Sequence, residues 1–553
     1  MNKPIQDATV AVTEATISPI TVEVIGSALS SIVEEMGEAL VRASYSTNIK
    51  ERRDSSTALF DMEGTTLCQA EHIPMHLGSF MEMIPCIMER YPVGTLRPGD
   101  VFVGNDAYVG GGTHLPDIVL AEPIFFDGKP VMWAVNTAHH SDFLDRGHDH
   151  IFQEGIRIPP IRLYAAGNLV QDVQDLILLN CQLPHERLPD FRAQLAANRM
   201  GVQRVQALCG KYGLSTVLRA GKALQDYAER KMRAGIRAIP DGVYSFEDTF
   251  DSPGSRGESL LFKTEITVKG DEMHLHFESP PQVRAAMNMN YTALLATVYY
   301  AVKSVVDPSI LPNAGLSRPL YVTAPKGTIL HCMSPAAVDG RIGPAQRVVD
   351  IIHGALIQAV PDKVTAAGNG GVPAVQFLGQ GADGRMWGYN ETIGGGSGAR
   401  FNKDGLDGVH VHMTNTSNLP VEALEIEYPI MLTRYELVKD SGGTGRYRGG
   451  MGIRRVYKVL EDCHGRMDIT RVLSQPWGVH GAGKGSSASI DATGVTFNGE
   501  YGFFKSGTVI EVRTAGAGGY GDPSARSAEA VSRDLAEERI SETAARAAYG
   551  WAG

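Results

Sequence analysis

Three residues in the first third of the chain carry side chains that bind divalent metal ions. His114 and Asp117 lie in the glycine-rich run 110–117, and His139 follows in Ala138-His-His-Ser-Asp142. Two neutral imidazole nitrogens and one carboxylate oxygen leave coordination positions open for water or substrate, which is typical of catalytic rather than structural metal sites. These residue types therefore predict a divalent metal ion that takes part in a reaction.

The sequence between Asp117 and His139 predicts a β-hairpin. Two apolar runs flank Asp127-Gly128, a dipeptide that favours tight two-residue turns. A hairpin returns the end of its second strand to the start of its first, so we expect His139 to lie beside Asp117. Pro116 disfavours a helix immediately before Asp117, so we expect a tight loop there.

Seven of the sixteen histidines lie between His72 and His150. Ordinary hydrogen-bonded loop histidines are the plain alternative to metal binding for any one of them. His140 could replace His139 as a ligand, because adjacent residues on a strand point to opposite faces and only one can face the ion. The sequence leaves that choice open.

Two carboxylates are further candidates for the site. Asp54 stands next to Arg52 and Arg53, so it could be a fourth metal ligand or the partner of a neighbouring arginine in a salt bridge. Glu154 could act as a general base, or it could orient a metal-bound imidazole by accepting its free N–H. A surface glutamate without a catalytic role is the alternative for Glu154.

The elements that must position these residues predict a large composite α+β fold, with a hairpin-rich metal region, a central helical segment and a β-rich C-terminal part. At 553 residues the chain has room for several domains, and composition shifts predict the divisions 17–238, 239–427 and 428–553. The residue patterns predict helices over 19–40, 172–238 and 289–306, strands over 244–277 and 428–512, and two short helices at the C-terminus, the second capped by Ser541.

Composition excludes several classes of function. The net charge of −11 opposes binding to nucleic acids, and no apolar stretch reaches the roughly 20 residues of a membrane span. The N-terminus lacks the basic-then-apolar layout of a secretory signal, so we expect a cytoplasmic protein. The six cysteines form no C-x-x-C pair, which argues against a disulfide framework and against a thiolate zinc site. No glycine-rich run has the context of a P-loop, so we do not expect ATP to bind this chain.

Motifs that run nearly end to end resemble those of the hydantoinase B/oxoprolinase family. This family includes the B subunits of N-methylhydantoinase and ATP-dependent caprolactamase, and subunits of acetone and acetophenone carboxylases. The matching stretches are 48–54, 69–78, 104–108, 112–117, 138–140, 151–160, 415–422, 440–443, 448–450 and 518–523.

The resemblance implies a metal site on His114, Asp117 and His139, with Asp54 as a fourth ligand or as a carboxylate close to the metal. We expect zinc there, with manganese or iron as alternatives. The resemblance also implies a hydantoinase A-like partner that binds ATP and phosphorylates the substrate oxygen, in a heterotetramer with this chain.

One segment departs from the family pattern. Family members commonly carry a Gly/Pro/Ser-rich insert after the double histidine, whereas here the short segment 141–152 leads directly to Glu154. This segment could reshape the substrate pocket or add metal ligands from Asp145, His148, Asp149 and His150.

The leading hypothesis is a metal-dependent subunit of an ATP-dependent cyclic amidase that opens hydantoin or lactam rings, with His140, Glu154 or Asp54 moving the proton. The alternative is a subunit of an ATP-dependent ketone carboxylase of the acetone or acetophenone type. A third hypothesis treats the two histidines and the aspartate as the facial triad of an Fe(II) oxygenase. That triad usually has one residue, not two, between the first histidine and its carboxylate.

Overall fold

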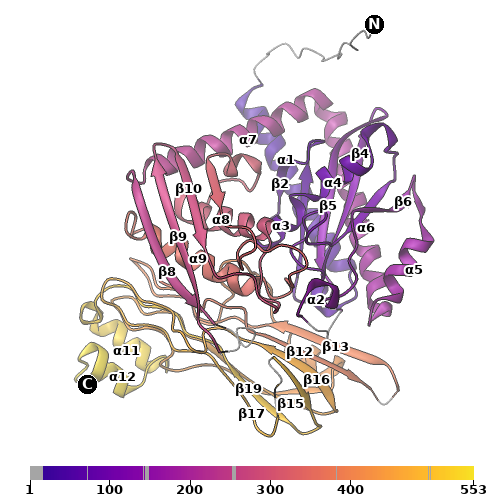
Figure 1. Cartoon of the computed structure of the whole chain (residues 1–553). Coiled ribbons are helices and arrows are strands. Elements are labelled where there is room, and N and C mark those ends of the chain that lie inside the picture. Colours follow the sequence, from indigo (N-terminus) through magenta and orange to yellow (C-terminus); the bar gives the residue numbers. More distant parts are fainter. Residues whose placement is uncertain are drawn as a thin grey trace.

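The computed structural model describes residues 17–553 except 71, 141, 143–147, 252–256, 382, 496 and 498–499. Within these ranges, four mainly antiparallel β-sheets alternate with helices along the chain (Figure 1). The predicted α+β class is confirmed.

The first sheet contains the predicted hairpin, and its strand order is β2-β1-β5-β4-β3-β6-β7. The two hairpin strands are the longest of this sheet and are almost fully buried, because helices cover both faces of the sheet. The bounds are β1 (Ser55–Phe60), β2 (Thr66–Gln69), β3 (Val101–Gly104), β4 (Asp117–Phe126), β5 (Lys129–His139), β6 (Ile161–Ala165) and β7 (Asn168–Leu169).

Helices α1 and α6 cover one face of this sheet, and α3 and α4 cover the other. The apolar stripe of α1 is buried as predicted, although Ser18 makes no side-chain capping hydrogen bond. The predicted helical region 172–238 is confirmed as three helices. The bounds are α1 (Pro19–Ala43), α2 (Thr47–Lys50), α3 (His76–Phe80), α4 (Met83–Arg90), η1 (Val93–Thr95), η2 (Ile151–Gln153), α5 (Gln171–Leu179), α6 (Pro184–Tyr212) and α7 (Leu214–Arg237).

The second sheet has the order β11-β10-β9-β8 and follows the end of α7. Buried and exposed residues alternate along β9, because one face packs against helices and the other faces solvent. The strands and the helix predicted for 244–306 are confirmed. The bounds are β8 (Gly242–Phe250), β9 (Leu260–Lys269), β10 (Glu272–Glu278), α8 (Tyr291–Val306), η4 (Ala314–Ser317), β11 (Leu320–Thr323) and α9 (Ile342–Leu356).

Two further sheets, β13-β12-β16-β18 and β14-β15-β19-β17, share one core that includes Phe377, Tyr457 and Phe504. Since β12 and β13 precede residue 428 and β12 pairs with β16, the division proposed at 427 passes through a single sheet. The bounds are β12 (Ala374–Gln380), β13 (Met386–Thr392), α10 (Val421–Glu427), β14 (Ile430–Leu437), β15 (Ile453–Val459), β16 (Cys463–Asp468), β17 (Ser489–Ala492), β18 (Tyr501–Phe504) and β19 (Val509–Arg513).

The chain ends in η5 (Pro523–Ala525), α11 (Ala528–Ala536) and α12 (Glu542–Tyr549). Ser541 caps α12 as predicted, since its side chain accepts from the Ala544 N–H. The glycine-rich runs of this region pack backbone against backbone. A Cβ on Gly396 would lie 2.1 Å from the carbonyl oxygen of Gly450, so a close backbone approach requires glycine there.

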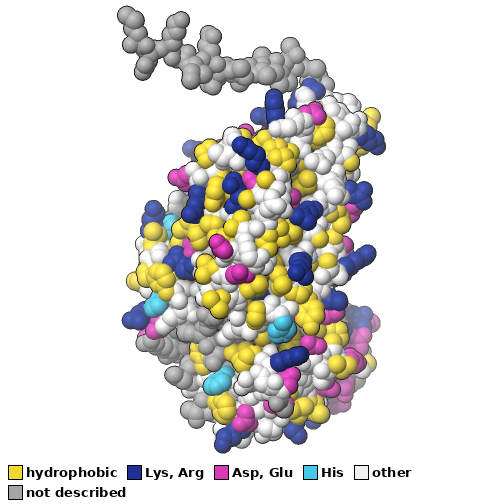
Figure 2. Space-filling view, turned by 90° about the vertical axis from the view of Figure 1, so that its right-hand side faces the viewer, with side chains coloured by type: hydrophobic (Ala, Val, Ile, Leu, Met, Phe, Trp, Pro, Cys, Tyr) yellow, Lys and Arg dark blue, Asp and Glu magenta, His cyan; other side chains and the backbone are white. Residues whose placement is uncertain are grey.

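The described helices include none with both the length and the apolar character needed to cross a bilayer. Figure 2 shows one face of the molecule, on which the coloured Lys and Arg side chains are dispersed among acidic and hydrophobic ones. A surface that binds nucleic acids typically gathers its basic residues into a patch or stripe. The coloured part of this face has no such gathering.

The turn between β4 and β5 has the two residues that the sequence predicted. Phe126 pairs with Lys129, which leaves Asp127 and Gly128 as the loop, with φ angles of 49° and 76°. Two successive left-handed residues match the right-handed twist of a hairpin. Directly beside this turn, the register shifts by one residue between Ile124 and Phe125, so that Asp117 pairs with His139 at the other end of the strands.

Replacing Gly128 with alanine should lower the free energy of unfolding by about 1 kcal/mol, because a left-handed backbone disfavours any Cβ. The new Cβ would meet no atom within 4 Å, so the cost is conformational. The matched variant Gly210→Ala adds an equally unopposed Cβ inside α6 and should raise stability by about 0.5–1 kcal/mol. Urea denaturation measures both variants, and shifts of the same sign would contradict this explanation.

Candidate metal centre

The strand order β1-β5-β4 brings three chain segments to one edge of the first sheet. Asp117, the first residue of β4, pairs directly with His139, the last residue of β5. On the other side of β5, the carbonyl oxygen of Asp54, just before β1, accepts a hydrogen bond of 2.9 Å from the His139 N–H. The predicted return of His139 to Asp117 is confirmed, and Asp54 joins this row.

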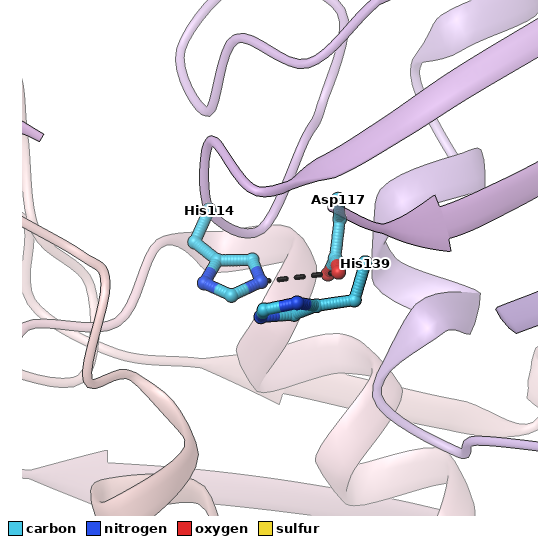
Figure 3. A group of neighbouring side chains, drawn as sticks. All are labelled: His114, Asp117 and His139. Atoms are coloured by element: carbon cyan, nitrogen blue, oxygen red, sulfur yellow. Dashed lines mark ion pairs between the residues drawn. The ribbon is translucent and has the colours of Figure 1, made fainter. Parts of the chain in front are cut away.

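The side chains of His114, Asp117 and His139 converge (Figure 3), and one ligand atom of each lies within 4.8 Å of the others. His114 is placed on the loop before β4, and its ring lies against that of His139, with 5.0 Å between ring centroids. His114 and Asp117 are buried, and His139 is partly exposed.

Two atoms of this group are well suited to bind an ion. His114 Nε2 and Asp117 Oδ1 form an ion pair of 3.1 Å, and neither buried atom makes a hydrogen bond to a further described residue. Buried polar atoms in proteins are nearly always satisfied, and here either a proton on His114 or a bound cation satisfies the pair. A divalent cation held by these two atoms and by His139 would satisfy both, and the nitrogen and oxygen donors fit zinc, manganese or iron.

The electrostatics of the group favour the protonation states that metals bind. Burial opposes ionisation of Asp117, but the positive charges of His114, His76 and Arg341 outweigh burial and hold its pKa well below the ordinary value. Burial lowers the pKa of His139 to about 4, so this imidazole is neutral near pH 7. A carboxylate and a neutral imidazole are the forms that coordinate a cation.

His114 differs from His139 in its preferred protonation state. Burial and Arg341 lower its pKa, but Asp117 and Asp339 raise it more, so the net pKa lies above the ordinary value. A cation must therefore displace a proton from His114, and binding should strengthen as the pH rises.

His76 lies between Asp54 and Asp117, although the sequence did not single it out from the other clustered histidines. Its Nε2 is 3.6 Å from Asp54 Oδ1 and 3.5 Å from Asp117 Oδ1. Its Nδ1 lies 2.9 Å from Ser56 Oγ, which holds the ring in place. Asp54 therefore lies next to the group, with His76 between them. In the sequence, the motif 69–78 that contains His76 was the signal that could have identified it.

The arginines beside Asp54 have other partners. Arg53 pairs with Glu38 at 2.7 Å. Arg52 is buried and donates to the carbonyl oxygen of Asn390 at 2.7 Å and to Thr392 Oγ1 at 2.8 Å, both on β13. Its guanidinium also contacts the side chain of Asn48.

Asn48 connects this arginine to the candidate metal centre. Its side-chain amide nitrogen lies 3.0 Å from His139 Nδ1 and donates to the carbonyl oxygen of His139. The predicted metal region is therefore tied, through Arg52, to a strand of the C-terminal sheets.

Two residues from the loop before α9 complete the group, and neither is marked by a local pattern in the sequence. Arg341 donates to Asp117 Oδ2 at 2.9 Å, and its other amino group lies 3.1 Å from His114 Nδ1. Asp339 Oδ1 lies 3.2 Å from the same Nδ1. When Nδ1 donates its proton to Asp339, the Nε2 lone pair of His114 is left for a cation.

His140 does not join the group. It follows β5 and faces α6, where its Nε2 lies 3.0 Å from Gln194 Oε1 and its ring packs on Phe191. Burial lowers its pKa to about 3, so it is neutral at ordinary pH. The predicted choice between the two histidines is resolved by geometry, since His139 faces the group and His140 faces away.

Glu154 is buried behind Asp339 rather than among the three converging side chains. Its Oε1 accepts the backbone N–H groups of Val338 and Asp339 at 2.8 and 2.7 Å. Burial and the Asp339 carboxylate raise the pKa of Glu154 to about 8. Glu154 therefore positions Asp339, whose carboxylate contacts His114. The sequence suggested that Glu154 orients an imidazole directly, whereas here it acts through Asp339.

Within the short segment 141–152, the described residues 148–150 lie around the group rather than within it. His148 Nε2 lies 3.2 Å from Asp339 Oδ2, and its ring also contacts Tyr501 on β18. Asp149 pairs with Arg284 at 3.3 Å, and the His150 ring packs on Phe152. Asp145 lies outside the described residues.

Glu154 should make stability fall as the pH rises. Its pKa in the folded chain lies above the ordinary value, so the folded state binds this proton more tightly and loses stability as the pH rises from about 4.5 to about 8. Glu154→Gln keeps the acceptor oxygen and removes the titration, so this variant should gain at least about 1 kcal/mol over the wild type at pH 8 relative to pH 5. Chemical denaturation at the two pH values measures this difference.

Glu89→Gln, on an exposed side chain, is the control for removing a carboxyl group, and it should leave the pH dependence of stability unchanged. Parallel stability curves for the wild type and Glu154→Gln would show that Glu154 does not titrate as described.

This chain is similar to known proteins along most of its length. The sequence pattern described as hydantoinase B/oxoprolinase matches residues 18–523. An uncharacterized protein of Methanocaldococcus jannaschii is 37% identical over 538 residues, which cover 94% of each chain. The B subunit of a putative D-/L-hydantoinase from Pseudomonas sp. (strain NS671) is 32% identical, over 97% of this chain and 95% of the relative.

Solved structures show the same fold. The crystal structure of the ATP-dependent caprolactamase from Pseudomonas jessenii has a TM-score of 0.86 at 29% identity, over 97% of this chain and 96% of that chain. A nucleotide-free acetone carboxylase structure has a TM-score of 0.87 at 19% identity, over 96% of this chain and 79% of that chain, which shows a shared fold alone. By the extent of the sequence match, this chain belongs to the hydantoinase B/oxoprolinase family.

Proposed function

We propose that this chain is the metal-dependent subunit of an ATP-dependent cyclic amidase, which opens a hydantoin or lactam ring together with an ATP-binding, hydantoinase A-like subunit in a heterotetramer. The observation that carries the proposal is the convergence of His114, Asp117 and His139, in which His114 Nε2 and Asp117 Oδ1 face each other with no further hydrogen-bond partner among the described residues. A divalent cation bound there would act as a Lewis acid toward a carbonyl or phosphoryl oxygen.

The residues around this point suit amide hydrolysis. An amide resists attack because its resonance must be broken and its nitrogen is a poor leaving group, so a hydrolase must move a proton to that nitrogen. Asp54 and His76 lie beside the candidate metal ligands, and we assign them to hold and transfer that proton. Arg341 neutralises Asp117 from the opposite side, and Glu154 fixes the loop that carries Asp339.

The partner follows from the relatives and from the motifs of this chain. One relative is the B subunit of a putative hydantoinase, and one similar structure is that of an ATP-dependent caprolactamase. The sequence of this chain has no P-loop motif, so we assign ATP binding and activation of the amide to a separate subunit.

The test is elemental analysis of the purified complex, combined with ATP-dependence assays on hydantoins, lactams and ketones. We expect about one zinc per chain, or manganese or iron in its place, and ATP-dependent ring opening. Carboxylation of a ketone would assign the chain to the carboxylase alternative, and oxygen uptake with bound iron would assign it to the oxygenases; either result would overturn the amidase proposal.

Replacing His114 or Asp117 with alanine should abolish metal binding and turnover, because each removes one donor of a three-residue site. Circular dichroism and co-purification of the partner should be unchanged. His185→Ala, on an exposed side chain, is the matched control and should retain metal and activity. Wild-type metal content in His114→Ala or Asp117→Ala would refute the assigned site.

Asp339→Asn should weaken metal binding by about tenfold to a hundredfold, because the carboxylate that orients His114 loses its charge. Competition with a chelating dye measures this affinity. Asp149→Asn removes an equal charge from the exposed segment nearby and should change the affinity by less than about twofold. Equal effects of the two substitutions would contradict a positioning role for Asp339.

A further inference from the structure

A cavity whose lining includes none of the three converging side chains lies where α8 meets the segment 409–415 and the loop 397–403. It consists of two adjoining hollows of about 450 and 620 Å³. Both are lined by Tyr300, Pro308, His410 and His412, so these four residues form a shared wall. Hollows of this size accommodate a small organic molecule.

The larger hollow has a cationic rim. Lys363, Arg400 and Lys403 line it and are exposed, and Asp362 is the acidic residue among its lining. Within the described part of the chain, none of these three basic side chains pairs with a carboxylate. By contrast, Arg454 pairs with Glu511 at 2.6 Å, as many other arginines of this acidic protein pair with carboxylates.

The backbone holds two of the three basic residues of the rim in fixed positions. Arg400 and Lys403 come from one tight turn, in which the Arg400 N–H donates to the Lys403 carbonyl oxygen at 3.0 Å. The Arg400 charge acts on two residues that line the larger hollow, His353 and Tyr300. It opposes protonation of His353, whose pKa burial lowers to about 3, and it moderates the rise that burial causes in the pKa of Tyr300.

The wall behind the rim is aromatic and held in place. The His412 ring packs edge-to-face on His353 at 5.5 Å and on Tyr300 at 6.2 Å. His353 is fixed between hydroxyl groups, with Nε2 3.2 Å from Ser304 Oγ. His412 has a φ of 53°, in the left-handed region that few non-glycine residues adopt, although histidine is among the more frequent ones there.

We propose that this cavity is a second small-molecule site, which takes an aromatic organic anion. The phosphate or carboxylate group binds Arg400, Lys403 and Lys363. The ring stacks on the shared wall, chiefly on Tyr300. Guanidinium and ammonium groups bind such anions by charge-assisted hydrogen bonds, and aromatic walls bind flat apolar rings. This inference does not depend on the reaction assigned above.

Calorimetric titration of the full chain tests the site with phenyl phosphate, phenylacetate, inorganic phosphate and benzyl alcohol, in buffer free of other multivalent anions. We expect saturable binding of phenyl phosphate, of phenylacetate or of both, at least tenfold tighter than that of inorganic phosphate or benzyl alcohol. The two aromatic anions show whether phosphate or carboxylate is preferred. Absence of saturable binding of both would overturn the proposal.

The double variant Arg400→Gln/Lys403→Gln should weaken binding of the aromatic anion by at least tenfold. Arg385→Gln/Lys505→Gln removes the same charge from exposed positions elsewhere and should weaken it by less than twofold. Equal losses in the two double variants would overturn the site.

His114→Ala separates this cavity from the candidate metal centre. The variant should bind the aromatic anion as the wild type does, even where metal and turnover are lost. Loss of anion binding in His114→Ala would place the anion at the metal centre and refute a second site.

Discussion

The candidate metal centre depends on the pairing of Asp117 with His139 at the open end of the β4–β5 hairpin. Backbone hydrogen bonds along strands of ten and eleven residues fix how far apart these two residues lie, and the buried faces of the strands prevent a shift in register. A shift by one residue would turn His139 toward α6 and bring His140 to the edge instead. The identity of the facing histidine is therefore a consequence of sheet register.

The hairpin supplies only part of the centre. Asp339 and Arg341 reach His114 and Asp117 from the loop before α9, more than 200 residues further along the chain. The Asp339 carboxylate raises the pKa of His114, and the Arg341 guanidinium lowers it. Both side chains are held by other buried groups. The centre thus forms where the first sheet meets the following α+β part, and its protonation state depends on both.

What could be predicted from the sequence was local. The Asp-Gly turn and the apolar runs beside it predicted the hairpin, and the periodicity of 19–40 predicted α1 equally well. The direct pairing of Asp117 with His139 also depends on a one-residue irregularity between Ile124 and Phe125, without which the turn register would place Asp117 opposite Ala138, and no sequence pattern marked it. Asp339 and Arg341 were beyond this reasoning, since their approach is a property of tertiary packing and no spacing rule connects them to His114. The pairing of β12 with β16 across residue 427 was beyond the same reasoning, because no local pattern encodes that partner.

The buried guanidinium of Arg52 has a consequence for dissecting the protein into fragments. Its hydrogen-bond acceptors on β13 lie about 340 residues from it, while its contact with Asn48 reaches the ring of His139. A fragment that ended before β13 would lose both of these acceptors, and the guanidinium that contacts Asn48 would no longer be held by them. The surroundings of the His139 ring are therefore set in part by strand β13 of the C-terminal sheets, through Arg52 and Asn48.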